Sequence, residues 1–233
     1  MSIKNFEGKS PFIHESFEYF LKQEGARRDA NAYLNRQGHL IPERDNWIKA
    51  TTAFTDAENN KEVVKFAVSD KVLLIGNRSS FSEGQYPGDP KAAGMSMIHI
   101  FAISRANYFN AVSLRKHEAS IINDMINFFR EQWKRPEFRE AVLAHQRNAI
   151  ENQGTEGRAQ ARQQWQELKG IVHQLKFEHF AFGFHLWPDN TVAHLHMHII
   201  AMPEKFRRYS TRLNDAKTVD AHEVRAEVKR HDE

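Results

Sequence analysis

The chain of 233 residues contains no cysteine. This absence excludes disulfide bonds and metal sites with thiolate ligands, so any metal ion would have to be held by His, Asp, Glu or carbonyl groups. It excludes little else, because many intracellular enzymes function without thiols.

Long hydrophobic runs are also missing. No segment approaches the ~18 consecutive apolar residues that indicate a membrane span. Residues 1–12, MSIKNFEGKSPF, lack the charged region followed by an apolar region that marks a signal peptide. We therefore expect a soluble, intracellular protein with no membrane partner, located in the cytoplasm, with the nucleus left open as an alternative.

The chain has no large excess of charge of either sign, because 33 Lys and Arg residues face 30 Asp and Glu residues, for a formal net charge of +3. A basic stretch at residues 205–212, KFRRYSTR, fits either an anionic ligand or a solvated surface segment. Zinc-finger spacing is absent, and no basic region leads into heptads. We therefore expect no dedicated DNA-binding motif.

The chain has a hydrophobic content of 40%, which is enough for one substantial core. Apolar residues at helical or alternating spacing predict the secondary structure. The predicted helices cover residues 12–21, 121–133 behind a cap at Ser113, 136–150, 158–175 and 222–229. The predicted strands cover residues 47–55, 63–69, 71–77, 95–104, 178–187 and 191–201. We expect an α+β fold, with an antiparallel sheet and helices mainly on one face.

The irregular loop at residues 78–94 contains three glycines and two prolines, and such loops often line binding sites. The most informative stretch follows later, at residues 191–203, TVAHLHMHIIAMP. In a strand, alternate side chains point to opposite faces, so His194, His196 and His198 would form one row with neighbours ~7 Å apart.

The turn signal at residues 188–190 predicts a hairpin between this strand and residues 178–187. A turn centred on residues 189–190 would pair residues whose numbers sum to 379. The predicted pairs are His185 with His194, Gly183 with His196 and Ala181 with His198. The small partners would leave room for a substrate group beside the middle histidine.

Three interpretations compete for the histidine row. In the first interpretation the histidines only cover an exposed polar face of the sheet, but such a face normally carries Thr, Lys, Glu and Ser rather than one residue type three times. A metal site is chemically reasonable, because imidazole is a common ligand and two histidines at i, i+2 can chelate one ion. In the third interpretation one imidazole attacks a phosphorus atom, while its neighbours hold the tautomer and donate hydrogen bonds to phosphate oxygens.

The segment 194–200, HLHMHII, resembles the signature of the histidine triad (HIT) superfamily of nucleotide hydrolases and transferases, in which three histidines alternate with apolar residues. Residues 97–109, MIHIFAISRANYF, resemble the upstream strand of that family, which carries a further active-site histidine, here His99. Ser104 and Arg105 replace the proline and lysine of the family. The resemblance covers residues 63–203 with large insertions. We expect one domain spanning 1–233, with a core at about 47–203. An N-terminal helix precedes this core and a charged extension follows it.

The resemblance also implies nucleotide-binding residues. Asn77 matches the position that holds the ribose, and Asn190 with Thr191 resembles the small polar pair that contacts the phosphate. His185 lies where several members have a polar residue on the preceding strand. The branches that remove mRNA cap remnants and resolve adenylated DNA ends resemble the turn at 185–188 most closely. His198 argues against the uridylyltransferase branch, which has Gln there.

The activity that the resemblance implies is attack by His196 on the α-phosphate of a nucleotide conjugate, with hydrolysis of a covalent nucleotidyl-histidine. His194 would orient His196 partly through its own carbonyl group, while His198 and His99 would bind phosphate oxygens or the leaving group. No metal or other cofactor is implied, and a homodimer is expected by analogy. With an unperturbed pKa of ~6.5 for His196, activity should fall as the pH drops through the mid-sixes.

Two alternatives remain at the level of sequence. One is a metal-dependent hydrolase or oxygenase that uses the same histidines, and the other is a nucleotide-binding protein without turnover. The remaining histidines have no partners at ligand spacing, so we expect them to be structural or on the surface. They are His14, His39, His117, His145, His173, His179, His222 and His231.

Overall fold

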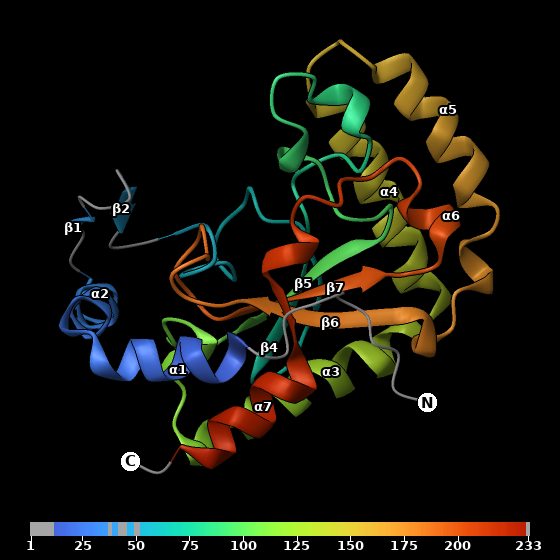
Figure 1. The fold of residues 1–233 in the computed structure, drawn as a ribbon. Coiled ribbons are helices and arrows are strands. Elements are labelled where there is room, and N and C mark those ends of the chain that lie inside the picture. Colours follow the sequence, from blue (N-terminus) through green and yellow to red (C-terminus); the bar gives the residue numbers. More distant parts are fainter. Residues whose placement is uncertain (1–11, 37–38, 42–45, 49–51, 232–233) are drawn as a thin grey trace.

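The computed structural model describes residues 12–36, 39–41, 46–48 and 52–231. At its centre lies a six-stranded sheet in the order β3-β4-β5-β7-β6-β8, in which all neighbours are antiparallel (Figure 1). Its strands are β3 (Lys65–Val68), β4 (Val72–Gly76), β5 (His99–Ser104), β6 (Phe180–His185), β7 (His196–Ala201) and β8 (Thr218–Asp220). A separate pair consists of β1 (His39–Ile41) and β2 (Asn46–Ile48).

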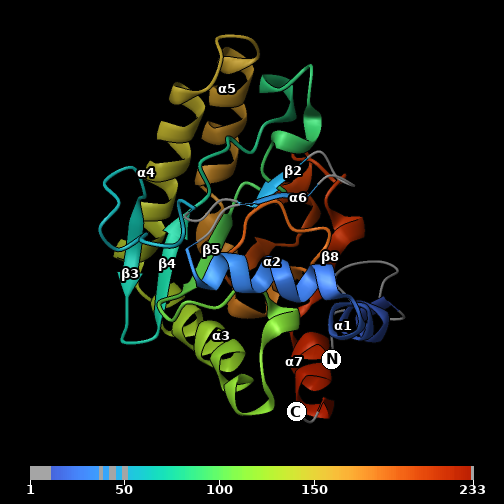
Figure 2. The same ribbon diagram turned by 90° about the vertical axis from the view of Figure 1, so that its left-hand side faces the viewer.

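The helices of the described residues are α1 (Phe12–Lys22), α2 (Glu24–Leu34), α3 (Ser120–Trp133), α4 (Pro136–Asn152), α5 (Arg158–Lys169), α6 (Glu204–Arg207) and α7 (Ala221–Arg230). Short 3-10 turns connect them, including η4 (Ala111–Ser113), η5 (Lys116–Glu118) and η8 (Asp215–Lys217). In both ribbon views α3 and α7 lie below the sheet, and Figure 2 shows α2 across the front of the strands. The predicted α+β class is confirmed.

The two faces of the sheet have different surroundings. Ile100 and Met197 point to one face, where they join the main core with apolar residues of α1, α3, α4 and α7. The other face carries His99, His196 and His198, and we refer to it as the histidine face. Most of the apolar helical surface is therefore buried behind the strands, which leaves the imidazoles on the side away from the main core.

The predicted strands are all shorter in the described residues than expected, and the strand predicted at 191–201 begins only at His196. Of residues 47–55, only 47 and 48 lie in a strand, which begins at Asn46. Residues 49–51 lie outside the described residues, and the chain turns after Thr52. There the backbone N–H of Thr52 donates to Thr55 Oγ1 at 3.0 Å, and that of Phe54 donates to Thr52 Oγ1 at 3.2 Å. Such local side-chain bonds compete with a strand ladder.

The strand predicted at 95–104 begins only at His99. Before it, Ser96 Oγ donates to the carbonyl of Ala201 at 2.8 Å, and the N–H of Met97 donates to the carbonyl of Phe206. The predicted cap at Ser113 is wrong for the long helix, because Ser113 ends a 3-10 turn capped by Asn110 and α3 begins at Ser120.

The helix predicted at 158–175 ends at Lys169. Gly170 follows it, and a separate 3-10 turn covers residues 172–174. Residues 12–22, 136–152 and 221–230 are helical as expected.

The predicted hairpin register is wrong by two residues. Gly183 pairs with His198 and Phe182 with Ile199, so paired numbers sum to 381 rather than 379. The link between the strands is ten residues, 186–195, and does not form a tight turn. Because the error is an even number, the side chains of the two paired strands, 180–185 and 196–201, keep their predicted faces.

The charged segment after residue 203 does more than cover the surface. Its β8 pairs with β6 at the sheet edge, and Val224 and Val228 of α7 are fully buried in the main core. At the other end, Ile13 and Phe17 of α1 belong to the same core. The core therefore contains residues from both terminal segments.

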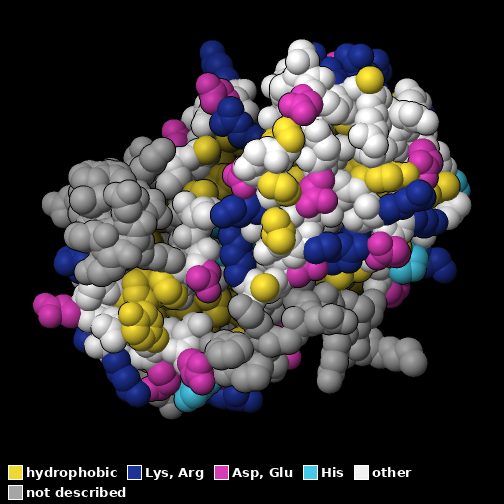
Figure 3. Space-filling view, turned by 45° about the horizontal axis from the view of Figure 1, so that its top comes forward, with side chains coloured by type: hydrophobic (Ala, Val, Ile, Leu, Met, Phe, Trp, Pro, Cys, Tyr) yellow, Lys and Arg dark blue, Asp and Glu magenta, His cyan; other side chains and the backbone are white. Residues whose placement is uncertain are grey.

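The surface shown in Figure 3 has Lys and Arg side chains interspersed with Asp and Glu, without a wide area of one sign. Within the described residues, no helix combines the length and apolar character that crossing a membrane requires.

Candidate active site

Four imidazoles meet on the histidine face, each less than a tenth exposed: His99 from β5, His185 from β6, and His196 and His198 from β7. The ring of His198 is central. Its centroid lies 4.0 Å from that of His185 and 5.3 Å from those of His99 and His196. The structure thus brings together four of the residues that the sequence singled out, and we refer to them as the histidine cluster.

His194 does not belong to this row, which corrects the prediction from simple alternation. Its φ of 105° lies in the left-handed region, and β7 begins only two residues later. The His194 ring turns away, where its Nε2–H donates to the carbonyl of Ser104 at 2.6 Å. Its Nδ1 accepts from the hydroxyl of Tyr33, also at 2.6 Å.

The backbone of His194 nevertheless contacts His196 at the carbonyl group to which the resemblance assigned an orienting role. His196 Nδ1 lies 2.7 Å from the His194 carbonyl oxygen. A carbonyl can only accept, so Nδ1 must carry the proton. Nε2 of a neutral His196 is therefore the unprotonated nitrogen, which is the form that a nucleophile or base requires.

A second chain of hydrogen bonds determines the tautomer of His198. The N–H of Met95 donates to His99 Nδ1 at 3.3 Å, and the Asn77 amide donates to the same nitrogen at 3.0 Å. The proton of His99 is consequently on Nε2, which donates to His198 Nδ1 at 3.1 Å. His198 Nε2–H is then a buried donor without a hydrogen-bond partner.

An unpaired buried donor costs roughly 1–3 kcal/mol. Six other buried side-chain atoms of the described residues also have no partner, so the importance of the His198 donor comes from its place in the cluster. A bound oxygen atom from a substrate would satisfy it.

Burial keeps the histidine cluster uncharged. Desolvation is the main cause that lowers the pKa of His196 to about 4 and the pKa of His99 to about 3. Burial, with the nearby Lys217 ammonium, lowers the pKa of His185 to about 2. The pKa of His198 also lies well below its ordinary value because of burial and the neighbouring imidazoles. Near pH 7 the cluster offers neutral donors and acceptors.

The structure adds residues that the sequence did not indicate. Tyr33 is fully buried on α2 and its hydroxyl links His194 to Thr55 Oγ1 at 3.0 Å. Thr218 of β8 accepts from His185 Nε2 at 3.0 Å and donates to the carbonyl of Asn214. Each lies far along the chain from its histidine, so no local spacing could have revealed these pairs.

Two phenylalanines form the apolar wall of the site. The Phe101 ring lies 4.9 Å from the rings of both His99 and His198, and the Phe54 ring lies 4.9 Å from that of His196.

The predicted nucleotide-binding residues differ in their placement. Asn77 lies directly at the cluster through its bond to His99, and its own carbonyl accepts from His145 Nε2 at 2.8 Å. Asn190 is buried and donates to the carbonyl of Val192 at 3.1 Å, whereas Thr191 is exposed. In the described residues, neither Asn190 nor Thr191 has a hydrogen bond to the cluster.

The four cluster histidines are poorly arranged to bind a single metal ion. His99 Nε2 and His198 Nδ1 point at one another, so both cannot be ligands of the same ion without rotating. Within the described residues, the one set of three ligating side chains whose atoms lie within 4.8 Å of one another is elsewhere, at His14, Glu18 and His231. In this arrangement the cluster histidines are not preorganised to share one metal ion.

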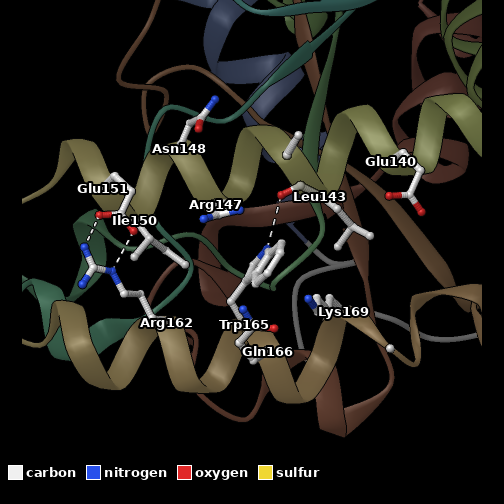
Figure 4. Close-up of a pocket in the computed structure, with 12 residues that line it drawn as sticks. Glu140, Leu143, Arg147, Asn148, Ile150, Glu151, Arg162, Trp165, Gln166 and Lys169 are labelled. Carbon is white, nitrogen blue, oxygen red and sulfur yellow. Dashed lines mark hydrogen bonds and ion pairs between the residues drawn. The ribbon is translucent and has the colours of Figure 1, made fainter.

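A cleft of about 890 Å³ between α4 and α5 is lined by none of the cluster histidines (Figure 4). The Trp165 indole there donates to the carbonyl of Leu143, and the charged ends of Lys169 and Arg147 lie 4.8 Å and 5.9 Å from its ring. An ion pair between Arg162 and Glu151 spans the two helices. These groups already satisfy one another, so the cleft does not rival the histidine cluster.

No protein-family model matches the chain, and no curated protein matches it. Among solved structures, it is similar to a Hit-like protein involved in cell-cycle regulation from Bartonella henselae, crystallised with an unknown ligand. The sequences are 13% identical, the TM-score is 0.35, and the match covers 75% of this chain and 92% of that chain. A likeness of this degree carries no argument, so the chemistry of the site rests on its own geometry. The fold and the site define an α+β protein with a buried, neutral histidine cluster on one sheet face.

Proposed function

We propose that this protein hydrolyses or transfers a nucleotide from a nucleotide conjugate, through a covalent nucleotidyl group on His196. The observation that carries the proposal is the pair of protonation states in the cluster. The His194 carbonyl holds the proton of His196 on Nδ1 and leaves Nε2 as the nucleophile, while His198 Nε2–H has no partner. One nitrogen can attack phosphorus and the other can donate to a phosphate oxygen.

The reaction would proceed in two displacements. The lone pair of His196 Nε2 forms a bond to the α-phosphorus, and the bond from phosphorus to the leaving group breaks. A water molecule, or another acceptor in a transfer reaction, then attacks phosphorus, and the electrons of the P–N bond return to Nε2. In hydrolysis the products are a nucleoside monophosphate and the leaving group, with the proton of the water released to solvent.

The supporting residues have positioning roles in this proposal. His99 holds the His198 tautomer, and Asn77 in turn holds His99. We assign Asn77, Asn190, Thr191 and His185 to the nucleotide side of the site, following the resemblance. The low pKa of His196 supports a neutral nucleophile near pH 7 without any neighbouring base.

Intact-protein mass spectrometry tests the proposal. The wild-type chain and the His198→Ala variant are mixed with adenosine and guanosine conjugates and quenched without acid, because a P–N bond is acid-labile. A mass gain of one nucleotidyl group, absent in His196→Ala, is the expected result. His196→Ala should also lower kcat by several orders of magnitude, as removal of a covalent nucleophile does. Turnover with only a few-fold loss in this variant would show that His196 is not the nucleophile.

A further inference from the structure

The first and last described helices meet at a cluster of two histidines and two glutamates. His14 and Glu18 are four residues apart on α1, and Glu227 and His231 are four residues apart on α7 and its end. Residues at i and i+4 of a helix share one face, so each helix directs one imidazole and one carboxylate to the junction. Sequence spacing gave no hint of this arrangement, because 213 residues separate His14 from Glu227.

The two imidazoles converge on one carboxylate oxygen. Glu227 Oε1 accepts from His14 Nδ1 at 2.7 Å and from His231 Nε2 at 3.0 Å. The rings of His14 and His231 are stacked, with centroids 5.8 Å apart. Single ligand atoms of His14, Glu18 and His231 all lie within 4.8 Å of one another.

Burial makes this junction more than a surface ion pair. The Glu227 side chain is only 4% exposed, whereas those of Glu18 and His14 are 32% and 65% exposed. Despite the opposing effect of burial, hydrogen bonds from His14, His231 and Arg230 lower the pKa of Glu227. A buried, ionised carboxylate thus forms one side of the junction, and accessible ligand groups form the other.

We propose that His14, Glu18, Glu227 and His231 bind one divalent transition-metal ion, with Zn²⁺ the best fit, and that the ion fastens α1 to α7. Zn²⁺ accepts four N and O ligands at ~2.0–2.2 Å, which places tetrahedral ligand atoms roughly 3.5 Å apart. The ligand atoms of His14, Glu18 and His231 lie within 4.8 Å of one another, a set that does not include Glu227, and rotations of the exposed His14 and Glu18 side chains would bring all four residues to one ion. Glu227 would change from accepting two N–H groups to ligating the ion, and each imidazole would bind the ion through its nitrogen that carries no proton, after rotation or a change of tautomer.

Cations already lie beside the two carboxylates of the junction. Glu18 and Glu227 together bring a charge of −2, and a bound divalent ion would share its neutralisation with the nearby Lys22 and Arg230. In the structure, Lys22 pairs with Glu18, and Arg230 donates to Glu227 Oε2 at 2.9 Å. These cations can remain as outer partners that orient the carboxylates. The ion would link segments more than 200 residues apart, so it would restrict the unfolded chain and stabilise the fold.

The proposal is independent of the activity of the histidine cluster, and metal binding tests it directly. The purified chain is stripped with a chelator, and Zn²⁺ binding is measured by calorimetry together with the shift in Tm. Co²⁺ then reports the geometry through its visible absorption bands, which are intense only in a tetrahedral site. We expect one ion per chain, a rise in Tm with Zn²⁺, and at least a tenfold loss of affinity in His231→Gln and in Glu18→Gln.

Two variants serve as controls. His222→Gln changes an exposed residue of α7 outside the junction, and His196→Asn changes the histidine cluster. Both should bind Zn²⁺ as the wild type does. Glu18→Gln leaves the buried bonds of Glu227 intact, so it remains informative if His231→Gln fails to fold. Absence of binding, equal binding in Glu18→Gln and the wild type, or loss of binding in His196→Asn would each overturn the proposal.

Discussion

Replacing His196 by asparagine should reduce the acid sensitivity of the fold. Burial lowers the pKa of folded His196 to about 4, whereas the unfolded residue titrates near 6.5. The unfolded chain therefore binds a proton as the pH falls below 6.5, and the folded chain does not until the pH approaches 4. The stabilising contribution of neutral His196 is complete above pH 6.5 and is lost as the pH falls towards 4.

The magnitude follows from the linkage between proton binding and unfolding. A full difference of one proton changes the free energy of unfolding by about 1.4 kcal/mol per pH unit. Between pH 6.5 and pH 5 this amounts to about 2 kcal/mol for His196 alone. In His196→Asn the side-chain amide can still donate to the His194 carbonyl, so the main hydrogen bond survives while the titration disappears.

Urea unfolding at pH 7 and pH 5 measures this difference. We expect the free energy of unfolding of His196→Asn to fall by about 2 kcal/mol less than that of the wild type over this range. His222→Asn, at an exposed position on α7, is the matched control and should follow the wild type. If His196→Asn and the wild type lose the same stability between the two pH values, the argument that burial keeps His196 neutral is wrong.

Three further predictions concern the site and its support. The value of kcat/KM should stay level from pH 8 to about pH 5, because the low pKa of His196 keeps the nucleophile neutral below the mid-sixes at which an unperturbed histidine would protonate. A pH profile of kcat/KM with an acid midpoint near 6.5 would contradict this prediction. Tyr33→Phe removes the donor to His194 Nδ1, and the unpaired nitrogen should cost about 1–3 kcal/mol in urea unfolding; no change would show that this hydrogen bond is unimportant. Gly76→Ala would place a Cβ atom 2.2 Å from the His145 ring, so it should destabilise the fold by about 1–3 kcal/mol. Adding His145→Ala should recover part of this loss. Equal stability of Gly76→Ala and the double variant would refute the clash.

The sequence alone determined which side chains share a face. A period of two places Met197 and Ile199 in the core and His196 and His198 on the opposite face, whatever the register of the strand. For that reason His196 and His198 keep their predicted face despite an error of two residues in the hairpin pairing. The helices behind the sheet could also be read from their apolar periodicity, because burial of one stripe is a local requirement.

Only the tertiary structure decided the chemistry of the individual imidazoles. His194 leaves the row because its backbone adopts a positive φ and because the hydroxyl of Tyr33, 161 residues away, donates to its Nδ1. The tautomers of His99 and His198 follow from the N–H of Met95 and from the approach of β5 to β7. Tautomer, pKa and burial depend on contacts between distant segments, and local sequence periodicity contains no information about those contacts.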